Sequence, residues 1–121
     1  MWKYLSLFWN LKALILYKGN LDTIILKLLS ENDKMYGYEI TQKVKELSQD
    51  KINIKEGALY PALHRLKSKG FLEVESLKVD NRIRKYYKLT EKGSKESLVK
   101  TAELKEFLAT MQLLLNPKMS F

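Results

Sequence analysis

Residues 54–93 read IKEGALYPALHRLKSKGFLEVESLKVDNRIRKYYKLTEKG, and the spacing of their apolar residues changes part-way along. Leu59, Leu63 and Leu66 recur at helical spacing, which predicts a helix with one buried face. Gly70 can take the left-handed conformation that closes a helix. Beyond it, apolar and polar residues alternate as in a β-strand. The stretch therefore predicts a basic helix, a glycine stop and a basic β-hairpin.

The turn of the hairpin sets the register of its strands. We take Asp80 and Asn81 as a two-residue turn. One face is then apolar near the base, whereas Arg82, Arg84 and Tyr86 lie on the other face. The predicted pairs are Val79–Arg82, Val74–Tyr87, Glu73–Lys88 and Leu72–Leu89. A slip by one residue would exchange the two faces, so burial of the apolar base selects this register.

The same residues resemble a known family. The runs GALYPALHRLKSKGFL and RKYYKLTEKG resemble the PadR family of bacterial transcriptional regulators, and GNLDTIILKLLSENDKMYGYEI resembles that family's first helix and the start of its second. The resemblance covers residues 18–93 and is more specific than any single short motif. It implies a short-form regulator: a winged helix-turn-helix DNA-binding domain that dimerises through C-terminal helical structure and usually acts as a repressor.

Composition agrees with a nucleic-acid partner. The chain of 121 residues has a net charge of +8, and residues 51–93 hold 11 Lys and Arg against 5 Asp and Glu. Such a concentration of positive charge favours a polyanion, because neutralising phosphates releases their counterions. A solvated basic surface is the plainer alternative. The absence of cysteine excludes disulfides and thiolate metal sites, and it fits a reducing cytoplasm.

The expected fold class is mainly α with a small β-hairpin, in three segments: an apolar helix at 1–18, a winged helix-turn-helix domain at 19–90 and a C-terminal dimerisation helix at 91–117. A membrane span needs ~20 apolar residues, and polar residues interrupt the first segment, so no stable membrane insertion is expected. No small-residue cleavage site follows it. We expect it to pack on the domain or on a second subunit, with membrane-surface binding as the alternative.

Two helices are expected before the basic one. Leu21, Ile24, Ile25, Leu28 and Leu29 follow the pattern of a buried stripe. A second helix is expected to begin at Tyr36-Gly37-Tyr38 and to bury Ile40, Val44 and Leu47. Tyr36 and Tyr38 could hydrogen-bond phosphates at that helix start or fill the helix junction, and the sequence leaves both interpretations open.

The start of the third, basic helix is less clear. Asn53 and Glu56 form a plausible capping pair. Pro61 is awkward in a helix interior because it lacks an N–H. The helix therefore either bends near Pro61 or becomes regular only from about Leu59.

DNA contacts are expected from the exposed side of this helix, the start of the second helix and the hairpin. The candidates are Tyr38, Lys55, Gly57, Ala58, Tyr60, Pro61, His64, Arg65, Arg82, Arg84 and Lys85. Gly57 and Ala58 permit close approach to base edges. Arg82 and Arg84 share a face and suit a phosphate or a narrow minor groove. The alternatives are packing of Tyr60 on the wing, a solvated position for His64, and protection of the sheet edge by the two arginines.

The last helix is expected to run from Glu91 to Leu115, with Thr90 as its cap and Asn116-Pro117 as its stop. It has too many apolar residues for an isolated helix, which predicts a partner surface in a homodimer. Packing back on its own domain is the alternative. The resemblance to PadR-like proteins, some of which bind aromatic compounds between subunits, also implies a small aromatic effector as a further hypothesis. The candidates for the dimer interface or effector pocket are Trp2, Trp9, Leu104, Phe107, Leu108, Met111 and Leu115.

The residues argue against catalysis. The chain has one histidine, no cysteine and no glycine-rich phosphate loop, so neither an enzyme, a cofactor nor a metal site is expected. The function expected is a dimeric repressor that binds double-stranded DNA sequence-specifically and is released by a small-molecule effector. The alternative is a winged-helix module for protein or RNA contact without sequence-specific DNA binding.

Overall fold

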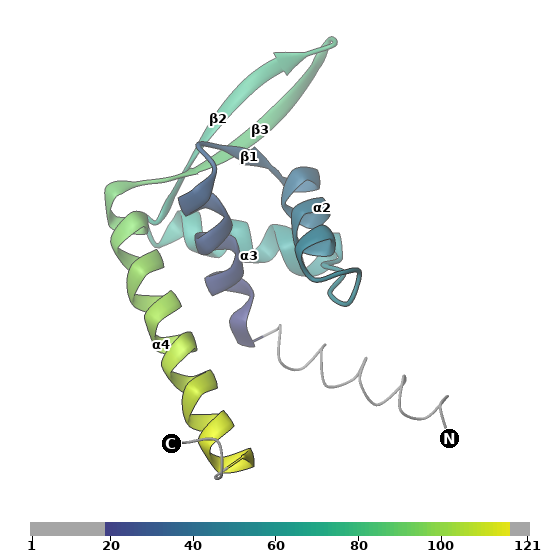
Figure 1. Cartoon of the computed structure of the whole chain (residues 1–121). Coiled ribbons are helices and arrows are strands. Elements are labelled where there is room, and N and C mark those ends of the chain that lie inside the picture. The colour runs from purple at the N-terminus through teal and green to yellow at the C-terminus, as the bar shows by residue number, and fades with distance from the viewer. Residues whose placement is uncertain (1–18, 117–121) are drawn as a thin grey trace.

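The computed structural model describes residues 19–116. The elements in chain order are a helix over residues 19–31, β1 (Met35–Tyr36), α2 (Gly37–Leu47), α3 (Glu56–Ser68), β2 (Leu72–Val79), β3 (Arg82–Leu89) and α4 (Glu91–Leu115). The three strands form one antiparallel sheet in the order β1-β3-β2. Figure 1 shows a helical body from which the β2–β3 hairpin projects at one end and α4 at the other. This winged-helix arrangement confirms the expected fold class.

The core lies between the 19–31 helix, α2 and α3. The predicted stripe of the first of these helices is buried, with Ile24 partly buried at its margin. Ile40 and Leu63 are fully inaccessible to solvent and join the three helices. Leu47 was expected in this core, but its side chain is 64% exposed. It is the last residue of α2, and it lines an apolar groove on the surface instead.

Helices α2 and α3 end in the same hydrogen-bonded turn. After α3, Gly70 has a φ of 82°, and the amide of Phe71 donates to the carbonyl of Leu66. After α2, Gln49 has a φ of 54°, and the amide of Asp50 donates to the carbonyl of Lys45. Both are Schellman turns, in which a left-handed residue follows the helix. The prediction for Gly70 is confirmed, whereas the turn after α2 was not expected.

The start of α3 differs from the expectation. Its N-cap is Lys55, and no side chain caps it. Asn53 is not the cap, because its amide group points back toward the turn and donates to the carbonyl of Asp50 at 3.4 Å. The helix is regular from Glu56 and contains Pro61, so the later start that the proline suggested is wrong.

The hairpin has the predicted register. Asp80 and Asn81 have φ of 49° and 62°, the left-handed values of a type I′ turn, and all four expected pairs are present. The sequence did not predict β1, whose Met35 and Tyr36 pair with Tyr87 and Tyr86. A strand of two residues is too short to show an alternating pattern.

The start of α4 is joined to the end of α3. As predicted, Thr90 caps α4, accepting from the amide of Gly93 at 3.0 Å, and its hydroxyl donates to the carbonyl of Gly70 at 2.6 Å. The amine of Lys92 donates to the carbonyl of Lys69 at 2.9 Å. Gly93 is buried so tightly that an added Cβ would overlap the carbonyl oxygen of Phe71. We call these residues, 69–71 and 90–93, the α3–α4 joint.

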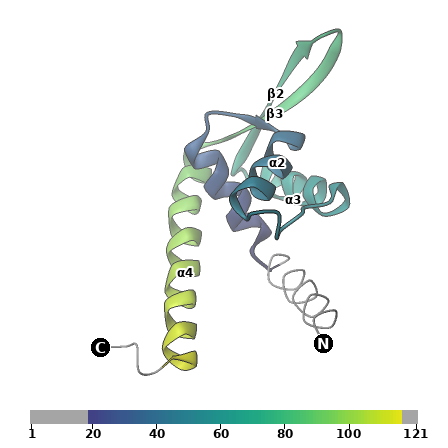
Figure 2. The same ribbon diagram turned by 45° about the vertical axis from the view of Figure 1, so that its right-hand side comes forward.

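The other end of α4 extends away from the body (Figure 2). Its apolar side chains are largely uncovered there: Phe107 is 54% exposed and Leu115 73%. An apolar groove of about 370 Å³ lies where α4 passes the body, with Leu104 and Leu108 on one wall and the 19–31 helix and the end of α2 on the other. No helix among residues 19–116 is long and apolar enough to cross a membrane. The expected 1–18 helix, with Trp2 and Trp9, lies outside the described residues.

Candidate nucleic-acid interface

Helix α3 has one buried and one open side. Leu59, Ala62, Leu63 and Leu66 face the core. The opposite side is exposed at Gly57, Pro61, His64 and Ser68, which recur at helical spacing. A Cβ added to Gly57 would meet no protein atom within 4 Å, so the fold does not require glycine at that position. Gly57 therefore leaves open space on the first turn of α3, where another molecule can approach the helix closely.

Two candidates at the margins of this side are held by other helices. The hydroxyl of Tyr60 lies against the start of α2, where a Cβ on Gly37 would come within 2.6 Å of it. Tyr60 is nevertheless 46% exposed. Arg65 binds Asp22 of the 19–31 helix, with Nη2 and Oδ1 2.7 Å apart. Tyr60 thus packs at the helix junction, and Arg65 lies toward the 19–31 helix.

A hollow of about 350 Å³ lies between α3 and the hairpin. It is lined by Tyr36, Gly37, Tyr60, Ile83, Arg84, Lys85 and Tyr87. Burial, with a smaller contribution from Tyr60, raises the pKa of the Tyr87 phenol, so this group is neutral at physiological pH. The hollow places aromatic and cationic side chains of the hairpin beside those of α3.

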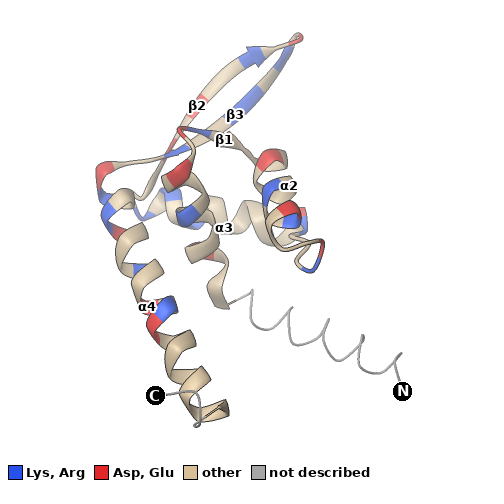
Figure 3. Ribbon diagram, in the orientation of Figure 1, with Lys and Arg blue, Asp and Glu red and all other residues tan. Residues whose placement is uncertain are grey.

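The two hairpin arginines have different surroundings. Arg82, next to the turn, is exposed, and its side chain has no partner within residues 19–116. Arg84 is half-buried, and its guanidinium carbon lies 4.6 Å from the ring centroid of Tyr36. A hydrogen bond with Tyr86 raises the pKa of Arg84 further above its ordinary value. Figure 3 shows basic segments along the hairpin and an acidic residue at its tip.

Side chains around Tyr36 form a wing-base cluster, which we define as Lys34, Tyr36, Tyr38, Glu75, Arg84 and Tyr86. The rings of Tyr36 and Tyr86 meet edge to face at 5.4 Å, and Tyr38 stacks on Tyr36 at 6.4 Å. Lys34 binds Glu75 with Nζ and Oε2 3.0 Å apart. The cluster joins β1 and the start of α2 to both strands of the hairpin. Tyr38, a DNA-binding candidate, belongs to it and is 63% exposed.

This geometry can be compared with known proteins. The sequence model of the PadR-like transcriptional regulator family matches residues 25–98. The chain belongs to the PadR-like family. Transcriptional regulator Rv3488 of Mycobacterium tuberculosis is 39% identical over 62 residues, which cover 51% of this chain and 55% of that protein.

Solved structures give the same assignment. A PadR-like transcription factor from Bacteroides fragilis is 36% identical with a TM-score of 0.67, covering 87% of this chain and 98% of that one. A PadR family regulator from Eggerthella lenta is 27% identical with a TM-score of 0.79, covering 96% and 98%. The PadR-like chain is thus a short-form transcriptional regulator and not an enzyme, and its family implies DNA binding through the winged helix.

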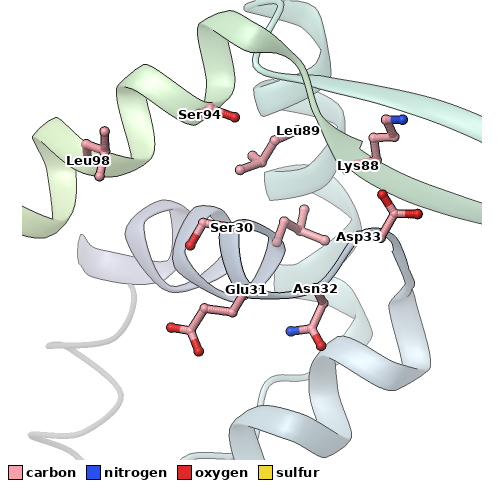
Figure 4. Close-up of a pocket in the computed structure, with 9 residues that line it drawn as sticks. Ser30, Glu31, Asn32, Asp33, Lys88, Leu89, Ser94 and Leu98 are labelled. Carbon is pink, nitrogen blue, oxygen red and sulfur yellow. The ribbon is translucent and has the colours of Figure 1, made fainter.

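Another surface hollow of this PadR-like chain lies away from α3 and the hairpin. It has a volume of about 450 Å³ and lies between the end of the 19–31 helix, the base of β3 and α4 (Figure 4). Its polar groups do not converge: Ser30 and Asn32 donate to carbonyls of their own helix. Across residues 19–116 there is no group of three or more His, Cys, Asp and Glu that could hold a metal ion. The hollow therefore offers no arrangement for catalysis.

Proposed function

We propose that the protein is a dimeric repressor that binds double-stranded DNA sequence-specifically. The observation that supports this most is the open side of α3, which has free space at Gly57 and exposes Pro61 and His64. A hairpin follows, and the arginine next to its turn has no side-chain partner within residues 19–116. Residues near the start of a recognition helix meet base edges in the major groove, and a basic wing meets the adjacent backbone.

The candidate residues then fall into two sets. We assign Lys55, Gly57, Ala58, Pro61 and His64 to the part of α3 that enters the groove. We assign Tyr38, Tyr60, Arg65, Arg82 and Lys85 to the margins and the wing, where phosphates would lie, whereas Arg84 lies against the ring of Tyr36. The pairing of Arg65 with Asp22 leaves its side chain 48% exposed, so the pair can meet a phosphate only at the edge of the surface.

Dimerisation is assigned to α4. Leu108, Leu114 and Leu115 are 57–73% exposed, and such apolar side chains on successive turns favour a partner surface. A two-fold pair of α4 helices would set two copies of α3 side by side along DNA, which suits a palindromic site.

Release by an effector is the remaining part of the proposal. The apolar groove beside α4 has a volume of about 370 Å³, which lies within the ~300–1,000 Å³ of ligand pockets. Leu104 and Leu108 form its α4 wall, and Phe107 and Met111 lie on the adjacent turn. A small aromatic compound bound there would contact the dimerisation helix and the domain together. Saturable quenching of tryptophan fluorescence by such compounds is expected, and the absence of any saturable change would remove this part of the proposal.

The test of DNA binding uses duplexes selected from a random-sequence pool by the wild-type protein. Fluorescence anisotropy should show affinity at least tenfold higher for a selected duplex than for its scrambled version, and selected duplexes should share a palindrome. Affinity should fall steeply with salt, because phosphate contacts release counterions. Arg82→Ala should weaken binding, whereas Lys95→Ala, which removes the same charge from exposed α4, should not. Equal affinity for scrambled DNA, or preference for RNA, would contradict the proposal.

A further inference from the structure

The two hairpin arginines share one face of β3 but differ in what surrounds them. Arg82 has no side-chain partner within the described residues, whereas the guanidinium of Arg84 lies over the ring of Tyr36. A guanidinium over an aromatic face is held there by electrostatic attraction to the ring. We propose that Arg82 contacts DNA, and that Arg84 is a positioning residue that fixes the wing relative to α2 and α3. The proposal rests on the proposed DNA binding.

Tyr36 is suited to receive Arg84 because it belongs to two elements. It pairs with Tyr86 in the sheet, and it is also the N-cap residue of α2. Its amide donates to a carboxylate oxygen of Glu39 at 3.1 Å, which holds its backbone at the start of the helix. A side chain that binds the Tyr36 ring is therefore bound to the helix-turn-helix body.

Arg84 extends an attachment that is otherwise short. The ladder between β1 and β3 has only two pairs, ending at Tyr86 on this face. Beyond Tyr86, β3 pairs with β2 alone among the strands of residues 19–116, so no other described strand lies beside the outer hairpin. Because side chains alternate, Arg84 is the next residue on the same face after Tyr86. Its contact with Tyr36 thus restrains the hairpin one step beyond the last β1 pair.

Lys34 and Glu75 provide a second attachment from the neighbouring strand. Their ion pair, at 3.0 Å, joins the residue before β1 to β2, and Lys34 also lies 5.6 Å from the ring centroid of Tyr86. Of these two attachments, the one at Arg84 is nearer to the turn, and within residues 19–116 neither reaches Asp80 or Asn81. Loss of Arg84 should therefore allow the outer hairpin, and Arg82 with it, to change its angle to α3.

A direct contact and a positioning residue differ in how the salt dependence of binding responds. Removal of a phosphate contact lowers the slope of log affinity against log salt by about 0.9. Arg82→Ala should therefore lower both affinity and slope. Arg84→Ala should lower affinity at least threefold and leave the slope unchanged, because the number of neutralised phosphates stays the same. An equal fall in slope for both variants would overturn the proposal.

Substitutions of Tyr36 test whether its aromatic ring is the group that holds Arg84. Tyr36→Phe keeps the aromatic face and should bind the selected duplex like the wild type. Tyr36→Leu removes that face and should weaken binding as Arg84→Ala does. The double variant should be no weaker than Tyr36→Leu alone, because that change already removes the contact that Arg84 makes. Arg84→Lys, which keeps a cation at this position, should bind better than Arg84→Ala. If the affinity losses of the two single variants add in the double variant, Arg84 acts independently of Tyr36.

Amide hydrogen exchange of the free protein tests the positioning role of Arg84 without relying on DNA binding. Amides of residues 82–86 should exchange faster in Arg84→Ala and Tyr36→Leu than in the wild type, and they should be unchanged in Tyr36→Phe and Arg82→Ala. Unchanged exchange in Arg84→Ala would overturn the positioning role. If exchange responds as expected while no variant, including the wild type, selects any duplex, the positioning role stands and the proposed DNA binding fails.

Discussion

The two ends of α3 are built differently. Its first turn has no side-chain cap, and the open position of Gly57 faces solvent. Its last turn is held by the α3–α4 joint, through the side chains of Thr90 and Lys92. The first end is thus available to a binding partner, whereas the second is fixed to the helix that we assign to dimerisation. We therefore expect the α3–α4 joint to couple a change in the proposed dimer to the position of α3.

Two glycines show the same contrast. Gly93 has no room for a Cβ because the carbonyl of Phe71 occupies that space, whereas Gly57 has open space. Glycine at position 93 is required by the fold. The fold does not require glycine at position 57. We expect this glycine to allow a binding partner to come close to α3.

The largest effect is expected from Gly93→Ala. The added Cβ would force the joint apart, and such overpacking typically costs up to about 3 kcal/mol. Urea denaturation should show a loss of this size in the free energy of unfolding. Gly19→Ala, where a Cβ meets nothing within 4 Å, is the matched control. A stable Gly93→Ala variant would mean that the joint is loose.

Thr90→Ala should cost less. It removes the N-cap of α4 and the hydrogen bond to Gly70, and loss of a cap costs about 1–2 kcal/mol. Thermal and urea unfolding should both report the loss. Thr90→Ser keeps the hydroxyl and should retain most of the stability; if serine is as damaging as alanine, the methyl group and not the cap matters.

Lys55→Ser should act in the opposite direction at the other end. Serine at the N-cap can accept from the uncapped amides, which should stabilise the protein by about 1 kcal/mol. Affinity for a selected duplex should fall, because a positive charge beside the groove is lost. Lys51→Ser, which changes the same charge before the N-cap, serves as the comparison. A gain in both stability and affinity would place this end of α3 away from DNA.

Gly57→Ala should have the smallest effect on stability. Alanine is favoured over glycine in a helix by roughly 0.5–1 kcal/mol, with the lower value expected in the first turn. The variant should unfold at a slightly higher urea concentration and bind the selected duplex several-fold more weakly. Unchanged affinity would show that DNA does not come close to this position.

Local features of the fold could be predicted from the sequence. Thr90, Gly70 and the Asp80-Asn81 turn act through their own and neighbouring backbone, and all three are confirmed. The register followed from alternation combined with that turn. The cap of α3 was wrongly predicted because Asn53 bonds the preceding turn instead.

Contacts between distant segments could not be predicted in this way. Arg65 and Asp22 are separated by 43 residues, and the sequence pattern of each helix alone cannot show that they meet. The contact of Arg84 with Tyr36 depends on β1, which has too few residues to be recognised. For these reasons the sequence identified the basic surface, whereas only the structure shows which of its side chains contact other parts of the fold.

The turn that ends α2 has a practical consequence. It is the counterpart of the turn at Gly70, but glutamine occupies the left-handed position that glycine fills most readily. A Gln49→Gly variant keeps the two backbone hydrogen bonds and relieves the crowding of the Cβ, and we expect it to melt at a higher temperature. Such a thermostabilised form would be a suitable starting material for crystals of the protein with an operator duplex.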